Sequence, residues 1–146
     1  MTIIEQLNDK EQKVMSQLKD FQRATVERVE YLFQHEQNRV LVADEVGLGK
    51  TLIAKGVIAK TAKIRYKEGD NLFKVVYVCS NQNIARQNIA KFDYQIDDYS
   101  KWRLSMQFYA IEKGEREKIN SGQYVQLLIL TPDTSFNQRG GQGTSQ

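Results

Sequence analysis

The segment that decides the fold is Arg39–Thr51, which reads RVLVADEVGLGKT. Its first part, Val40–Ala43, is a continuous apolar run of the kind that forms a strand buried on both faces of a parallel sheet. Gly47 and Gly49 interrupt this run, and a helical pattern of apolar residues begins at Thr51. A buried strand, a loop with two glycines and a helix, in this order, predict a phosphate-binding loop.

The loop has the residue types that a triphosphate requires. Gly47 and Gly49 permit unusual backbone angles and a close approach of the backbone to a polyanion. A helix that starts near Thr51 would point its N-terminal amides and the positive end of its dipole at the phosphates. Lys50 would reach the β- and γ-phosphates, and the hydroxyl of Thr51 would ligate Mg²⁺. We therefore predict that the loop binds ATP and Mg²⁺, with Lys50 and Thr51 as the catalytic residues. The residues predicted to bind this cofactor are Glu45, Val46, Gly47, Leu48, Gly49, Lys50 and Thr51.

The rest of the chain alternates between helical and strand periodicity. Helices are expected at 3–18, at 20–35 with Asp20 as the N-cap, from Thr51 onward, at 81–92 and, as a short charged helix or turn, at 113–119. Further strands are expected at 73–79, 102–111 and 124–131, the last stopped by Pro132. Strands and helices in this rhythm predict an α/β fold with a mostly parallel sheet flanked by helices.

Composition and length restrict the class of protein. With 146 residues and 40% hydrophobic content, the chain can build one ordinary globular core. The longest apolar runs are far too short to cross a bilayer, and Met1–Glu5 lacks the layout of a secretory signal. One cysteine, Cys79, cannot form a disulfide within the chain, and one cysteine with one histidine cannot build a His/Cys zinc site. We expect a cytoplasmic protein with no membrane partner.

The charge distribution contains one basic stripe. The net charge is only +3, but Lys60, Lys63 and Lys67 would share one face of a helix. Such a stripe can follow a phosphate backbone, although an ordinary solvated helix surface is the simpler interpretation.

The loop at 44–51 also resembles motif I of superfamily 2 helicases and translocases, particularly those of the Swi/Snf-like branch. Asp44 stands where the general nucleotide-binding loop has its first glycine, and the pair Asp44-Glu45 is typical of that family. The resemblance implies a RecA-like P-loop NTPase, a bacterial helicase-type ATP hydrolase whose partner is nucleic acid, DNA rather than RNA.

Three other segments resemble elements of the same family. Leu18–Gln22 is similar to the element before motif I, which implies that Gln22 hydrogen-bonds the adenine edge; the alternative is a surface helix residue. The strand Val75–Cys79 with the loop after it resembles motif Ia, although family members often have proline where Ser80 stands. Leu128–Phe136 is similar to the segment between motifs Ia and II. The nucleic-acid contacts implied by these resemblances are Ser80, Asn81, Arg86, Thr131 and Thr134.

ATP hydrolysis also needs an acid that holds Mg²⁺, and usually an arginine finger. No Asp-Glu box follows Leu130 in these 146 residues, and Asp133 lies two residues beyond the strand end where that acid belongs. We therefore expect the N-terminal portion of a RecA-like domain that does not hydrolyse ATP alone and whose partner is the rest of the motor, including a second RecA-like lobe. The expected organisation is N-terminal helices at 1–36, a partial ATP-binding domain at 37–136 and a flexible tail at 137–146. A stand-alone P-loop module that acts through a partner protein is the alternative, and a small P-loop kinase is a third interpretation.

Overall fold

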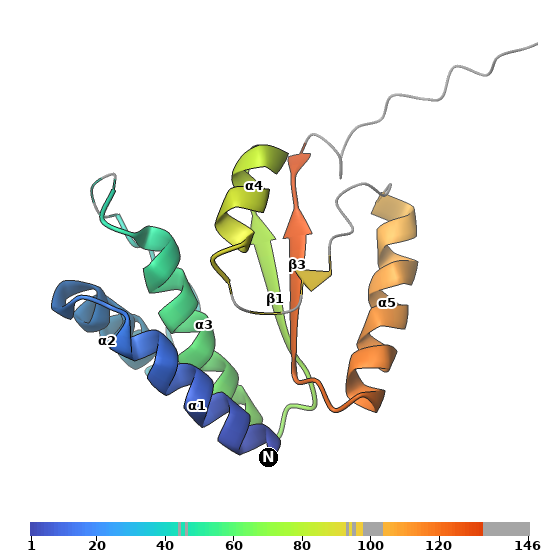
Figure 1. The fold of residues 1–146 in the computed structure, drawn as a ribbon, viewed down its shortest axis with the longest axis horizontal. Helices are drawn as coiled ribbons and strands as arrows, with labels where there is room; N and C mark the ends of the chain where they lie inside the picture. Colours follow the sequence, from blue (N-terminus) through green and yellow to red (C-terminus); the bar gives the residue numbers. More distant parts are fainter. Residues whose placement is uncertain (44, 46, 93, 95, 98–103, 133–146) are drawn as a thin grey trace, which may run out of the picture.

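The computed structural model describes residues 1–43, 45, 47–92, 94, 96–97 and 104–132. These residues form a small parallel sheet with helices around it (Figure 1). The elements in chain order are α1 (Ile3–Ser16), α2 (Asp20–Gln34), α3 (Lys50–Lys67), β1 (Phe73–Val78), α4 (Gln82–Ile89), β2 (Ile96–Asp97), α5 (Leu104–Asn120) and β3 (Val125–Leu130).

The sheet has the order β1-β3-β2, and both pairings are parallel. β1 pairs with β3 from Phe73 opposite Val125 to Val78 opposite Leu130. The central strand β3 is the most apolar and the most buried, as a strand covered on both faces should be. Helices α1, α2 and α3 lie on one side of the sheet and α5 lies on the other (Figure 1). The predicted α/β class and the parallel sheet are confirmed, and the chain has a partial RecA-like P-loop fold.

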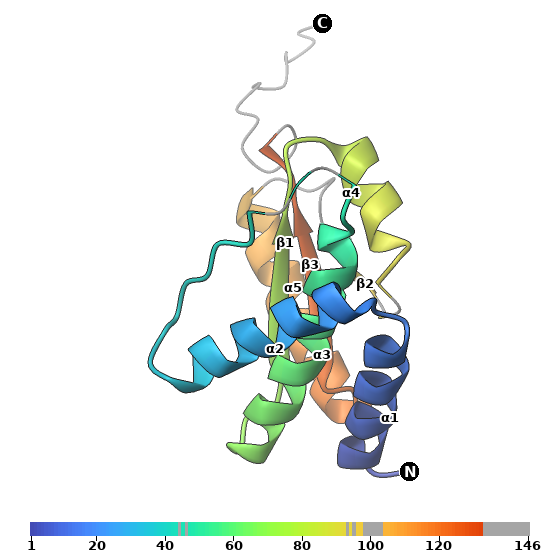
Figure 2. The same ribbon diagram turned by 90° about the vertical axis from the view of Figure 1, so that its left-hand side faces the viewer.

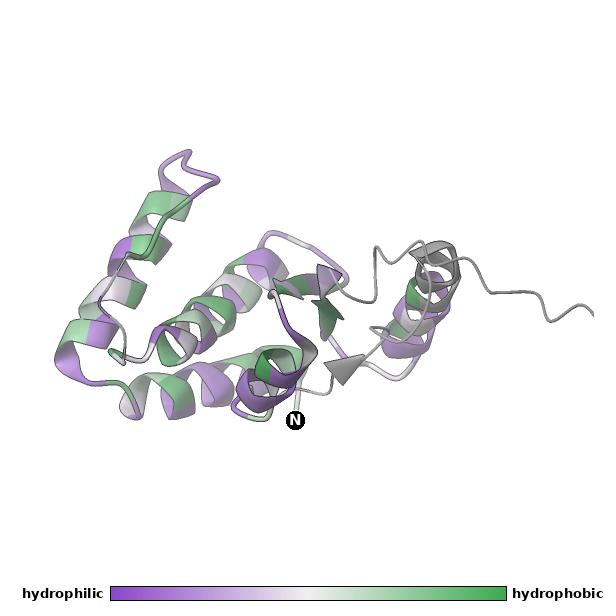
Figure 3. Ribbon diagram, turned by 90° about the horizontal axis from the view of Figure 1, so that it is seen from above, coloured by the Kyte–Doolittle hydropathy of each residue, from purple (hydrophilic) through white to green (hydrophobic). Residues whose placement is uncertain are grey.

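Helix α3 is the centre of the core because it contacts α1, α2 and the sheet. At one end, Ala62 packs with Leu7 of α1 and Tyr124 next to β3. At the other end, Ile53 packs with Val26 of α2 and with Leu18 in the turn between α1 and α2. Seen from above, the hydrophobic strands lie between helices α1–α3 on one side and helix α5 on the other (Figure 3). The helix that follows the predicted phosphate loop is therefore held on two sides.

Gly56 allows α2 to cross α3 at close range. A Cβ on Gly56 would lie 2.8 Å from Cγ2 of Val26 and 3.2 Å from Cδ1 of Leu18. Val26 is fully buried, so it has little room to move away. The close crossing brings the start of α2 next to the start of α3.

A charged cluster also ties the three N-terminal helices together. Lys60 of α3 lies 3.3 Å from Glu11 of α1 and 2.8 Å from Glu30 of α2, and Lys63 lies 2.7 Å from Glu11. Burial by itself raises the pKa of Glu11, but the hydrogen bonds and charges of Lys63 and Lys60 outweigh it and hold that pKa below its ordinary value. Burial by itself lowers the pKa of Lys60, but the hydrogen bonds and charges of Glu30 and Glu11 outweigh it and hold that pKa above its ordinary value.

The strand predicted at 40–43 is wrong. These residues form no ladder with the sheet; they run as an extended segment from the end of α2 to the loop before α3 (Figure 2). Val42 packs against the cluster of Leu18, Val26 and Ile53, while Leu41 is 88% exposed. An apolar run becomes a buried strand only where neighbouring strands can hydrogen-bond to both of its edges, and the described strands do not lie beside this segment.

Two further expectations differ from the structure. Leu104–Asn120 is one helix, so the strand predicted at 102–111 is wrong where the structure describes it. The apolar residues there, Leu104, Phe108 and Ile111, also fit a helical spacing, and the charged segment that follows extends the same helix. Asp20 is the first residue of α2 rather than its N-cap, which is Lys19. The tail predicted at 137–146 lies outside the described residues.

We expect Glu11→Gln to lower the free energy of unfolding by about 1–2 kcal/mol at pH 7, because both lysines lose a charged partner. The pKa of Glu11 is lowered in the folded state, so its contribution is present above the unfolded pKa and is lost as the pH falls through the folded pKa. Urea unfolding at a series of pH values from 7 downward should show the difference between wild type and variant shrinking toward zero. The control is Glu27→Gln at an exposed position of α2. An equal loss at every pH would contradict the account.

Candidate phosphate-binding site

The candidate site is the loop that ends in the first turn of α3. Gly49 is the N-cap of α3 and has a left-handed backbone, with φ +80° and ψ +41°. Gly47 also has a positive φ of +88°. Residues with a side chain rarely adopt these angles, so two glycines are needed to turn the chain into the helix at this place. The first N–H groups of α3 lack intrahelical acceptors and lie at the positive end of its dipole, which is the arrangement that binds anions.

Lys50 is the first residue of α3, and its side chain reaches back across the loop. Its Nζ donates a hydrogen bond to the carbonyl oxygen of Glu45 at 2.9 Å, and the N–H of Leu48 donates to the same oxygen at 3.4 Å. The ammonium group is exposed and lies over the loop rather than in the core. A lysine in this position can exchange a backbone carbonyl for a phosphate oxygen.

Gln22 lies against the other side of the loop. Its side chain is 4% exposed, and its Nε2 donates to the carbonyl oxygen of Leu48 at 2.9 Å. Its Oε1 accepts the N–H of Lys19 at 3.0 Å, at the start of α2. The surface-residue alternative for Gln22 is therefore wrong, whereas its adenine contact stays a prediction.

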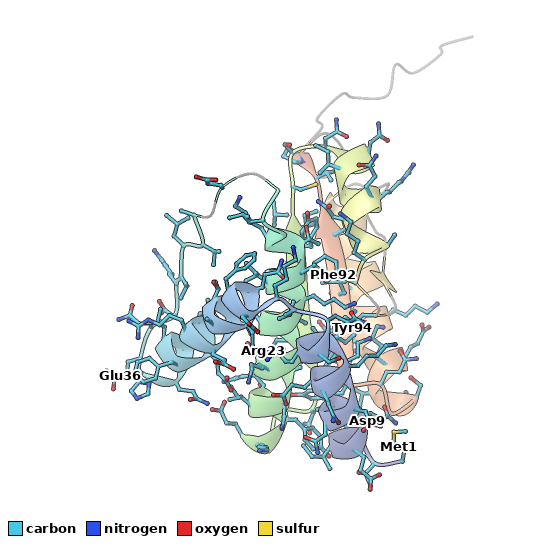
Figure 4. The ribbon with its side chains drawn as sticks, turned by 60° about the vertical axis from the view of Figure 1, so that its left-hand side comes forward. Met1, Asp9, Arg23, Glu36, Phe92 and Tyr94 are labelled. Carbon is cyan, nitrogen blue, oxygen red and sulfur yellow. The ribbon has the colours of Figure 1, made fainter. Side chains whose placement is uncertain are left out.

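The start of α2 is itself fixed on α1. Nη2 of Arg23 lies 3.4 Å from the carbonyl oxygens of Met15 and Leu18, where the chain passes from α1 to α2 (Figure 4). The turn before α2 is thus closed by a guanidinium group from the first turn of α2. Gln22 projects from a backbone that is held in place.

The structure brings most of the predicted loop residues together. Gly47, Leu48, Gly49, Lys50 and the half-buried Thr51 adjoin one another at the N-terminus of α3. Glu45 contributes its carbonyl oxygen to Lys50. Val46 and Asp44, the residue that distinguishes this loop from the general pattern, lie outside the described residues.

The residues predicted to contact nucleic acid differ in their exposure to solvent. Ser80, Asn81 and Arg86 are exposed just beyond the carboxyl end of β1. The side chain of Asn81 accepts the N–H of Asn83 at 2.7 Å, so it caps α4. Thr131 is fully buried, which places its hydroxyl inside the protein. Thr134 lies outside the described residues.

The basic stripe of α3 is largely neutralised. Of its three lysines, Lys60 and Lys63 are paired with the carboxylates of Glu11 and Glu30. Their ammonium groups join helices together, so Lys60 and Lys63 form neither an open phosphate-binding stripe nor the ordinary solvated surface considered as its alternative.

Sequence reasoning missed the bond between Gln22 and the loop. One signal was available, because a glutamine three residues after an N-cap commonly bonds back to the N-cap N–H. That signal locates Oε1 of Gln22 but leaves the partner of Nε2 open. The partner depends on how α2 crosses α3, and the spacing along the chain does not contain this information.

The family described as type III restriction enzyme, res subunit (ResIII), matches residues 15–144. No curated protein and no solved structure matches the chain. In the part of the chain that the structure describes, no helix is long and apolar enough to cross a membrane.

The two loop glycines differ in what an added side chain would contact, and this difference can be tested. We expect Gly47→Ala to cost about 1–2 kcal/mol of stability, the strain of a side chain at a left-handed position. Gly49→Ala should cost more, because its Cβ would also lie 2.5 Å from Nε2 of the buried Gln22. A Cβ at Gly47 would meet no described atom within 4 Å, so the close contact with Gln22 distinguishes the Gly49 substitution from the Gly47 substitution. Urea unfolding that gave equal losses for the two variants would argue against a tight contact between the loop and Gln22.

Proposed function

The chain belongs to the ResIII family of type III restriction enzyme res subunits, and we propose that it binds MgATP as part of a superfamily 2 DNA helicase or translocase. The observation that carries this proposal is the junction at Gly49, where a left-handed glycine leads directly into α3 with Lys50 as its first residue. A loop of this sequence, joined to a helix in this way, is suited to a triphosphate. The eight-residue resemblance at 44–51 favours the Swi/Snf-like branch.

In the proposed complex the loop would bind the phosphates and Mg²⁺ through three kinds of group. The N–H groups at the start of α3 would donate to phosphate oxygens, and Lys50 would release the carbonyl of Glu45 to reach the outer phosphates. The hydroxyl of Thr51 would be a ligand of Mg²⁺, which when bound neutralises charge on the triphosphate. Both side chains follow the left-handed Gly49, so the same turn orients them.

We place the nucleic acid at the carboxyl ends of the strands. Ser80 and Arg86 are exposed there, and hydroxyl and guanidinium groups are suitable donors to a phosphate backbone. The family name refers to a restriction enzyme, which supports DNA rather than RNA. The basic stripe of α3 is not part of this surface, because Lys60 and Lys63 are paired with Glu11 and Glu30.

We also propose that ATP hydrolysis requires groups beyond these residues. Strand β3 leads into Thr131 and Pro132 rather than into an Asp-Glu pair, and no other acidic pair follows in the sequence. A second lobe that supplies an acid and an arginine would complete the motor, and closure of two lobes on ATP would move the strand.

Lys50→Ala tests the proposal. Because the side chain is exposed and bonds only the loop carbonyl among the described contacts, we expect the fold to survive and MgATP affinity to fall at least tenfold. Titration calorimetry measures the affinity, and Lys67→Ala at the opposite end of α3 removes the same charge as a control. Unchanged affinity in Lys50→Ala would overturn the proposed site. Steady ATP turnover by the 146 residues, abolished by Lys50→Ala, would overturn the proposal that hydrolysis needs further groups.

A further inference from the structure

The carboxamide of Gln22 bonds to protein at both ends. It lies in the first turn of α2, 26 residues before Leu48 in the sequence, and it is 4% exposed. Its Oε1 accepts the N–H of Lys19 and its Nε2 donates to the carbonyl of Leu48. One side chain therefore joins the start of α2 to the phosphate loop.

The bond to Leu48 fixes the orientation of the next N–H group. No described peptide bond is cis, and in a trans peptide the C=O and the following N–H point in opposite directions. Because the carbonyl of Leu48 points at Gln22, the N–H of Gly49 points away from α2. Gly49 is the N-cap of α3, so this N–H belongs to the group of amides at the positive end of the helix.

The contact is close enough to restrict the loop. A Cβ on Gly49 would lie 2.5 Å from Nε2 of Gln22 and 3.7 Å from its Cδ, so the backbone at Gly49 lies directly on the carboxamide. The backbone of α2 is held close to α3 through the contact of Val26 with Gly56, and the carboxamide is bonded at both ends. The peptide between Leu48 and Gly49 thus lies between a buried side chain bonded at both ends and the first turn of α3.

We propose that Gln22 is a positioning residue of the phosphate loop, which orients the Leu48–Gly49 peptide so that its N–H is available to a phosphate group. The inference rests on the proposed binding of a triphosphate at this loop. A loop held in the binding-competent conformation binds with higher apparent affinity, in proportion to the fraction of molecules that have that conformation. The effect acts on phosphates whatever base they carry, whereas an adenine contact acts on the base alone.

The test compares MgATP with inorganic tripolyphosphate and Mg²⁺. Gln22→Met keeps the length of the side chain and removes both hydrogen bonds. We expect both affinities, measured by calorimetry, to fall by the same factor of roughly three- to tenfold, the usual effect of one lost hydrogen bond. The control is Gln34→Met, at the exposed C-terminal end of α2, which should leave both affinities unchanged. A thermal unfolding curve for each variant separates loss of positioning from loss of the fold.

The outcomes separate the inference from the proposed function. A loss for MgATP with tripolyphosphate unchanged would show that Gln22 contacts the base, and it would overturn the positioning role. Unchanged affinity for both ligands would overturn it as well. Binding of neither ligand by the wild-type chain would overturn the proposed function and this inference with it.

A second variant and a ligand-free measurement keep the test decisive if Gln22→Met does not fold. Gln22→Glu retains the acceptor for the N–H of Lys19 and loses the donor to Leu48. We expect the backbone ¹⁵N order parameter of Gly49 in the ligand-free protein to fall in either variant, because the peptide is no longer held. An order parameter equal to that of wild type would contradict the inference, since a residue that only contacts the base has no effect without nucleotide.

Discussion

The left-handed turn at Gly49 is the constraint on which the rest of the structure depends. It sets the start of α3, it directs the first amides of that helix to one side, and it brings the backbone against Gln22. Only glycine meets both conditions, a positive φ and a close neighbour where a Cβ would lie. The helix that begins there then makes the contacts with α1, α2 and β1 that build the core.

The N-terminal helices act as the support of the loop. Gly56 and Val26 bring α2 close to α3, and the ion pairs of Lys60 and Lys63 join α3 to Glu11 of α1 and to Glu30 of α2. Neither feature touches the loop; both lie on the helices that carry Gln22 and the first residues after the loop. A partly buried ion cluster of this kind adds modestly to stability, and here it joins side chains from three helices.

The sequence predicted the parts that depend on local chemistry. The glycines and the Lys-Thr pair located the start of α3, and the apolar runs at 73–79 and 124–131 located β1 and β3 within about one residue. It failed where neighbouring elements decide the structure. Val40–Ala43 has the composition of a buried strand, but none of the described strands lies beside it, and Leu104–Ile111 fits two periodicities. The bond from Gln22 to Leu48 depends on the crossing of α2 and α3, which only the folded chain specifies.

The most direct measurement of the central claim is a backbone amide NMR titration of the wild-type chain with MgATP. The account predicts that the largest shift changes occur at Gly47, Gly49, Lys50 and Thr51 and that they decline along α3 as its distance from the loop increases. Separate addition of Mg²⁺ and of sodium chloride at matched ionic strength should leave these amides unchanged. Absence of any change on addition of MgATP, or changes concentrated on a different element with the loop unaffected, would contradict the account.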